Sequence, residues 1–123
     1  MTCISSQRGH RYRVMCRLKD IPCNGSKGVG ARAGTEYAEL ILVRTNDEVF
    51  AYRNRCPHTG APMEWQPNVF LDCTSRQIQC GLHGALFRIH DGYCIFGPCA
   101  GRSLEPVAVC ITGESVIVMD DGP

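Results

Sequence analysis

The apolar residues of this 123-residue chain come in short runs that are separated by turn-forming residues. Several of these runs alternate apolar with polar residues, which is the period-two pattern of a half-buried strand. No stretch keeps the 3.6-residue period of an amphipathic helix. The sequence therefore predicts an all-β domain, with strands at Tyr12–Leu18, Ala38–Arg44, Val49–Arg53, Val69–Leu71, Gln77–Cys80, Leu86–His90, Val107–Ile111 and Ser115–Met119.

Dipeptides that end in glycine mark most of the predicted turns. Asn24-Gly25, Asp91-Gly92 and Thr112-Gly113 supply residues that tolerate the positive φ of tight hairpins. One glycine-rich stretch, Cys23–Gly34, is predicted to be a loop. It lacks the Gly-Lys-Ser/Thr ending and the strand-to-helix context of a phosphate-binding loop, so that reading is excluded.

Size and composition fit one domain that spans residues 1–123. The net charge of +1 gives no reason to expect nucleic acid or an anionic membrane as a partner. No apolar run approaches the roughly 20 residues that a membrane helix needs. The first residues lack the apolar stretch of a secretory signal, so we expect a cytoplasmic protein with no membrane contact.

Two short segments carry the residues with the clearest chemistry. The first is Cys56-Pro57-His58-Thr59-Gly60-Ala61-Pro62, and the second is Cys80-Gly81-Leu82-His83-Gly84-Ala85-Leu86-Phe87. Each segment offers one thiolate and one imidazole, followed closely by glycine. Zinc also accepts two sulfurs and two nitrogens. Zinc fingers, however, usually pair cysteine with cysteine and histidine with histidine, whereas here each segment supplies a mixed pair.

The mixed pattern, C-x-H followed by C-x-x-H, resembles that of the Rieske family, in which one iron takes both cysteines and the other both histidines. The resemblance implies a 2Fe-2S cluster on Cys56, His58, Cys80 and His83. It also implies a fold of three stacked antiparallel sheets, with a two-loop cluster-binding tip within residues 54–100.

The resemblance extends beyond the four ligands, over about Ala38 to Val109. Glu48–Arg55 resembles the strand that enters the first cluster loop, and Leu86–Gly92 resembles the hairpin after the second. Gly97-Pro98 is similar to the proline loop that covers the cluster. The residues implied to surround the cluster are Gly60, Gly84, Phe87 and Pro98; the two glycines would let backbone N–H groups approach the sulfurs.

The residues around the implied cluster indicate a subclass. High-potential members of respiratory complexes carry a disulfide between the two loops, at positions that here are Ala61 and Leu82. They also carry serine and tyrosine hydroxyls that donate to the cluster sulfurs, where this chain has Ala85 and Phe87. We therefore expect a reduction potential toward the lower end of the family's range. The segment 59–79 between His58 and Cys80 is longer than in typical members.

The implied function is electron transfer by a small protein that is not itself an enzyme. Its partners would be a flavin-containing reductase and a terminal oxidoreductase such as an oxygenase. Oxygenase activity of its own would need an iron on two histidines and a carboxylate, and only His10 and His90 remain. A redox-sensing or accessory subunit and a zinc-stabilised module stay as alternatives.

Nine cysteines are many for a chain of this length. Their odd number and the lack of an export signal favour a metal site with spare thiols over a disulfide framework. The cysteines that are not implied as ligands are expected to be small buried groups or idle thiols; they are Cys3, Cys16, Cys23, Cys73, Cys94, Cys99 and Cys110.

Overall fold

The computed structural model describes residues 11–30, 37–46, 48–57, 59–64, 66–81 and 84–120. Within these ranges the regular structure is strand, apart from one 3-10 turn, so the all-β prediction is confirmed. None of the described residues belong to a helix long and apolar enough to cross a membrane. The elements are β1 (Arg11–Arg17), η1 (Leu18–Asp20), β2 (Gly25–Val29), β3 (Leu40–Arg44), β4 (Val49–Arg53), β5 (Gln77–Gln79), β6 (Leu86–Arg88), β7 (Cys94–Phe96), β8 (Pro106–Thr112) and β9 (Ser115–Asp120).

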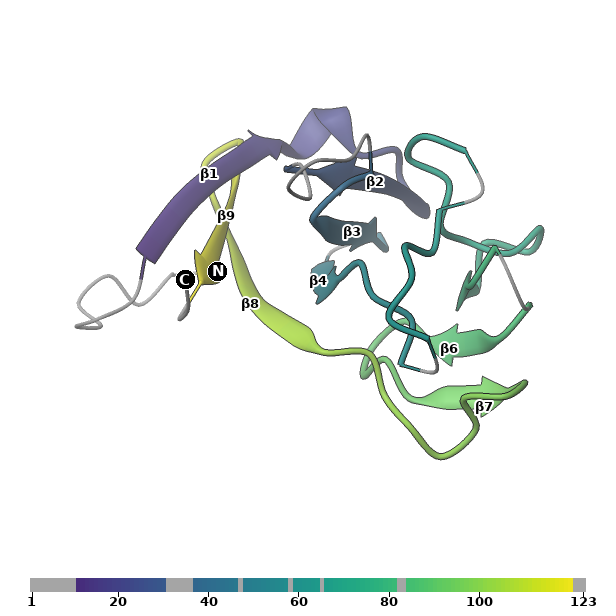
Figure 1. Cartoon of the computed structure of the whole chain (residues 1–123). Helices are drawn as coiled ribbons and strands as arrows, with labels where there is room; N and C mark the ends of the chain where they lie inside the picture. Colours follow the sequence, from purple (N-terminus) through teal and green to yellow (C-terminus); the bar gives the residue numbers. More distant parts are fainter. Residues whose placement is uncertain are drawn as a thin grey trace.

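The strands form three antiparallel layers, two of which share β8. One continuous hydrogen-bonded order runs β1-β9-β8-β4-β3-β2, and a separate small sheet has the order β5-β6-β7. The start of β8, at Pro106 and Val107, pairs with β4, whereas Ala108–Thr112 pairs with β9. Figure 1 shows β8 curving from its partner β9 towards β4. The predicted arrangement of three stacked sheets is therefore confirmed, with β8 as the link between two of them.

Strand β3 has buried side chains on both of its faces. Successive residues of a strand point to opposite sides, so Leu40 and Leu42 face one core and Ile41 and Val43 face the other. The first core is completed by residues that include Val116 and Val118 of β9, and the second by residues that include Phe70, Ile78 and Phe87. The small sheet β5-β6-β7 is thus fixed to the second face of β3.

Tyr52 of β4 ties the middle sheet to the β6–β7 hairpin. Its buried hydroxyl donates to the carbonyl of Ile89, just beyond β6. Burial raises the pKa of Tyr52 to about 12, and the negative charge of Asp91 acts in the same direction. Gly92 lies so close to the ring that a Cβ there would come within 2.8 Å of a Tyr52 ring carbon. The hairpin turn therefore packs directly against β4.

Three elements differ from those predicted. Strand β2 lies inside the segment predicted as a loop, and β7 was not predicted at all. The predicted strand Val69–Leu71 is wrong, because these residues form only isolated bridges, from Val69 to Gln66 and from Leu71 to Ile78. The glycines of β2 led to the wrong prediction of a loop, because one of them is needed for close packing inside a strand. A Cβ on Gly28 would lie 2.6 Å from the Cβ of Ala38 and 3.3 Å from the Phe70 ring.

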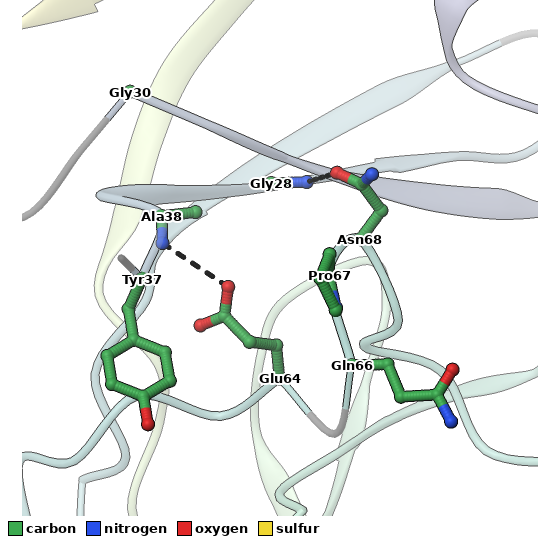
Figure 2. A pocket seen from close by; sticks show the side chains of 8 residues that line it. All are labelled: Gly28, Gly30, Tyr37, Ala38, Glu64, Gln66, Pro67 and Asn68. Atoms are coloured by element: carbon green, nitrogen blue, oxygen red, sulfur yellow. Dashed lines mark hydrogen bonds between the residues drawn. The ribbon is translucent and has the colours of Figure 1, made fainter. Parts of the chain in front are cut away.

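The long segment 59–79 is attached to the edge strand β2. The Asn68 side chain accepts a hydrogen bond from the backbone N–H of Gly28 at 3.0 Å, as Figure 2 shows. The Ser26 hydroxyl donates to the Asn68 carbonyl and accepts from the Phe70 N–H. Phe70 itself is fully buried. The extra length therefore covers an edge strand, which would otherwise offer unpaired backbone groups.

We predict that Phe70→Ala lowers the free energy of unfolding by about 3–5 kcal/mol, because it removes a buried ring and leaves a cavity between β2 and the second core. Urea unfolding of the purified protein measures this. Val69→Ala is the matched control: its side chain is 39% exposed, so the change should stay within about 0.5 kcal/mol. Equal losses for the two variants would show that the segment is not anchored by Phe70.

Candidate metal centre

The structure brings the two predicted cysteine ligands into neighbouring loops. Cys56 lies shortly after β4, and Cys80 directly follows β5. Both side chains are buried, at 1% and 0% exposure, and neither is in a disulfide. The backbone N–H of Gly81, next to Cys80, donates to the carbonyl of Met63 at 2.9 Å. This bond joins the second loop to the end of the first.

The two loops are closed by the same backbone hydrogen bonds. In the first loop the N–H of Cys56 donates to the carbonyl of Ala61 at 2.9 Å, and the N–H of Gly60 donates to the carbonyl of Cys56 at 2.7 Å. The glycine adopts a φ of 77°, a left-handed conformation that glycine adopts at little cost.

The second loop repeats this pattern with the same spacing. Cys80 N–H donates to the carbonyl of Ala85, and Gly84 N–H donates to the carbonyl of Cys80, both at 2.9 Å. Gly84 has a φ of 69°. Each loop is therefore a compact turn that starts at a buried thiol and closes four and five residues later.

The two predicted histidine ligands, His58 and His83, lie outside the described residues, so their part in the site stays a prediction. Among the residues that the structure does describe, no three His, Cys, Asp or Glu side chains come together. What the structure places is the thiol half of the donor set. Two buried sulfurs at the start of twin turns suit a metal that prefers soft ligands.

The two glycines that close the loops have open space beside them. A Cβ added to Gly60 would meet nothing within 4 Å, and one added to Gly84 would meet only the amide of Gln79 at 3.8 Å. These glycines are therefore required by their backbone conformation and not by close packing. The donor set and the open loop surface are compatible with the predicted 2Fe-2S cluster.

Asn54 fixes the first loop and was not singled out by the sequence analysis. This buried side chain accepts a hydrogen bond from the N–H of Met63 at 2.8 Å. Its amide nitrogen donates to the carbonyl of Ala38 at 2.9 Å and to the carboxylate of Glu64. Because Met63 also receives the bond from Gly81, Asn54 holds the point where both loops meet.

A hollow of about 290 Å³ lies beside this network, between Tyr37, Glu64 and Pro67 (Figure 2). Its carboxylate, Glu64, is engaged by the N–H of Ala38 at 3.2 Å and by Asn54. Glu64 therefore supports the loop framework.

The loop after β7 contacts both cysteine loops. A Cβ on Gly97 would lie 2.9 Å from the Cα of Ala85, so the chain passes directly over the second loop. Arg102 donates to the carbonyl of Pro57 in the first loop at 3.1 Å. Pro98 between them is exposed, and its role as cluster cover stays a prediction. Phe87 is fully buried in the second core, and its place beside the cluster is likewise a prediction.

The remaining cysteines fall into distinct environments. Cys23 and Cys73 are exposed, whereas Cys94 and Cys99 are buried. The prediction of an idle thiol is wrong for Cys110, which is disulfide-bonded. Burial raises the pKa of the Cys16 thiol, and Asp20 raises it further.

Cys99, in the loop after β7, touches a predicted ligand. Its sulfur lies 3.6 Å from the sulfur of Cys56, with both side chains buried. The sequence pattern offers no signal for this contact, because the two residues are 43 positions apart.

Comparison with known proteins gives one family match and two curated relatives. The Rieske [2Fe-2S] domain family matches residues 11–119. Apoptosis-inducing factor 3 of Mus musculus and of Homo sapiens are each 29% identical over 79 residues, which is 64% of this chain. The matched stretch is only 12% of the length of these relatives.

Solved structures with the same fold include three that cover most of both chains. One is a chain of the complex of reduced oxygenase and oxidised ferredoxin in carbazole 1,9a-dioxygenase, with a TM-score of 0.68, 24% identity, and coverage of 87% of this chain and 91% of that one. The ferredoxin of carbazole 1,9a-dioxygenase from Nocardioides aromaticivorans IC177 has a TM-score of 0.66 and 22% identity, and the match covers 87% of this chain and 95% of that one. The Sphingomonas yanoikuyae B1 ferredoxin has a TM-score of 0.65 and 23% identity, and the match covers 92% of this chain and 100% of that one. At these identities the similarity establishes the fold.

We predict that Gly97→Ala destabilises the protein more than Gly101→Ala, although both glycines have a large positive φ, 101° and 91°. Each substitution strains the backbone by about 1–3 kcal/mol. Only at Gly97 does the new Cβ also collide with Ala85, whereas Gly101 has open space. The collision should add about 1–3 kcal/mol. Urea midpoints measure both losses; equal values would mean that the loop does not press on the second cysteine loop.

Proposed function

This chain belongs to the Rieske [2Fe-2S] domain family, and we propose that it is an electron carrier whose one 2Fe-2S cluster is bound by Cys56, His58, Cys80 and His83. The observation that carries the proposal is the pair of matched turns, each of which starts at a buried cysteine. Their shared spacing sets both thiols at the start of equivalent loops. Each loop then has its histidine before the closing glycine, at positions 58 and 83.

The family's cofactor supplies a one-electron couple, and neutral imidazoles in place of two thiolates place its potential above that of all-cysteine clusters. The chain's own residues hold the site and keep water away from it. Cys56 and Cys80 are buried, and the loop from Gly97 to Arg102 crosses from the second cysteine loop to the first. Backbone N–H to carbonyl hydrogen bonds close both turns and fix the backbone of the two cysteines.

The proposed partners are a flavin-containing reductase and a terminal oxidoreductase such as an oxygenase. In support, several structures of the same fold are ferredoxins, and one is from a complex with an oxygenase. The match to one such ferredoxin covers the entire length of that ferredoxin and 92% of this chain. We infer a carrier that is not itself an enzyme and that works in the cytoplasm.

Protein-film voltammetry on the wild type and on two histidine variants tests the proposal. We predict a reversible one-electron wave in the lower part of the family's range of about −150 to +300 mV. His83→Ala should lose the wave and the bound iron, because it removes a predicted ligand. His90→Ala is the control, since His90 lies in the exposed β6–β7 turn with 69% of its side chain accessible.

Either of two results would contradict the assignment: a wild type with bound zinc and no wave, or a His83→Ala variant that keeps both the wave and the iron. Stopped-flow mixing of the reduced protein with an electron acceptor then separates a carrier from a redox sensor. A carrier is reoxidised rapidly, whereas a sensor changes its affinity for a partner with its redox state.

A further inference from the structure

The loop after β7 places a second buried thiol against one of the predicted ligands. The sulfurs of Cys99 and Cys56 are 3.6 Å apart, and each side chain is 1% exposed. This separation is within the range of a hydrogen bond between two sulfur atoms, and either thiol could be the donor.

Cluster binding would decide which sulfur donates. A cysteine that ligates a metal does so as the thiolate and has given up its proton. Cys56 could then only accept, so the hydrogen bond would have to come from the S–H of Cys99. The thiol of Cys99, buried at 3.6 Å from that sulfur, is placed to be this donor.

We propose that Cys99 donates a hydrogen bond to the ligand sulfur of Cys56 and thereby raises the reduction potential of the cluster. This inference rests on the proposed function, because it requires Cys56 to be a ligand. Reduction adds negative charge to the cluster and its sulfurs, so a donor that faces a ligand sulfur stabilises the reduced state more than the oxidised one. Cys99 would thus act on the cluster through the sulfur of Cys56 and not as a ligand itself.

The surrounding loop holds Cys99 in this orientation. The carbonyl of Cys99 accepts the N–H of Arg102 at 2.8 Å, and the N–H of Ala100 donates to the carbonyl of Gly97. The guanidinium of Arg102 also donates a hydrogen bond to the carbonyl of Pro57, the residue that follows Cys56. The thiol therefore sits on a short turn that is fastened to the same loop as its acceptor.

Two hydroxyl donors that the family resemblance implies for high-potential members are replaced in this chain. At Ala85 and Phe87 this chain lacks the side-chain hydroxyls that the high-potential members use. Both of these residues are fully buried near the second cysteine loop. A thiol is a weaker donor than a hydroxyl, so Cys99 would recover only part of the lost stabilisation, and from the side of the first loop.

The test is the reduction potential of the cluster-loaded protein with Cys99→Ala, Cys99→Ser and Cys94→Ala. We expect Cys99→Ala to lower the potential, with the ratio of reduced to oxidised protein falling by up to about tenfold at a fixed electrode potential, or about 59 mV for one electron. Cys99→Ser keeps a donor and should stay nearer the wild type. Cys94→Ala removes a buried thiol that is directed at the carbonyl of Phe96, so its potential should not change.

A spectroscopic readout separates tuning from packing. The iron–sulfur stretching bands in the resonance Raman spectrum should shift in D₂O by a larger amount in the wild type than in Cys99→Ala. If Cys99→Ala does not assemble, Cys99→Val provides a second variant without a donor. Thermal unfolding reports any purely structural effect.

Several outcomes would overturn the inference. These are an unchanged potential in Cys99→Ala, an equal shift in Cys94→Ala, or identical D₂O effects with and without the Cys99 thiol. In each of these cases the wild-type wave remains and the proposed function stands. Absence of any wave in the wild type would instead remove the proposed function, and this inference with it.

Discussion

The burial of β3 on both of its faces is the constraint on which the rest of the architecture depends. Leu40 and Leu42 complete one core, and Ile41 and Val43 complete the other. A strand with two apolar faces cannot lie at the surface, so it needs a layer on each side. One layer is formed by β1, β8 and β9, and the other contains the β5-β6-β7 sheet (Figure 1). Both cysteine loops are attached to this second side.

Sequence patterns predicted the features that depend on neighbours along the chain. The apolar run at Leu40–Val43 and the turn pair Asp91-Gly92 are local signals, and both matched the structure. Strand β2 was not predicted because one of its glycines, Gly28, makes room for Phe70, which lies more than 40 positions away. The roles of Asn54 and Cys99 were missed because their partners are not sequence neighbours: Ala38 lies 16 positions from Asn54, and Cys56 lies 43 positions from Cys99. The ligand pattern could be predicted from the sequence because its cysteines and histidines lie in two short motifs.

The candidate site combines a hydrogen-bonded frame with two buried cysteine sulfurs. The frame consists of main-chain bonds in the two turns and of the Asn54 amide, which contacts Ala38, Met63 and Glu64. Backbone bonds of this kind position ligands without depending on side-chain identity. The proposed redox tuning, in contrast, depends on side chains such as Cys99, whose sulfur lies 3.6 Å from that of Cys56. One framework can therefore serve carriers of different potential.

The measurement that tests the central claim most directly is the EPR spectrum of the purified protein after reduction with dithionite, together with iron and acid-labile sulfide analysis. The account predicts two irons and two sulfides per chain, and a signal with the low average g value of histidine-ligated 2Fe-2S clusters. A colourless protein that contains zinc, or one that binds no iron after anaerobic reconstitution, would contradict it. In that case the twin turns would serve a structural metal or the fold alone.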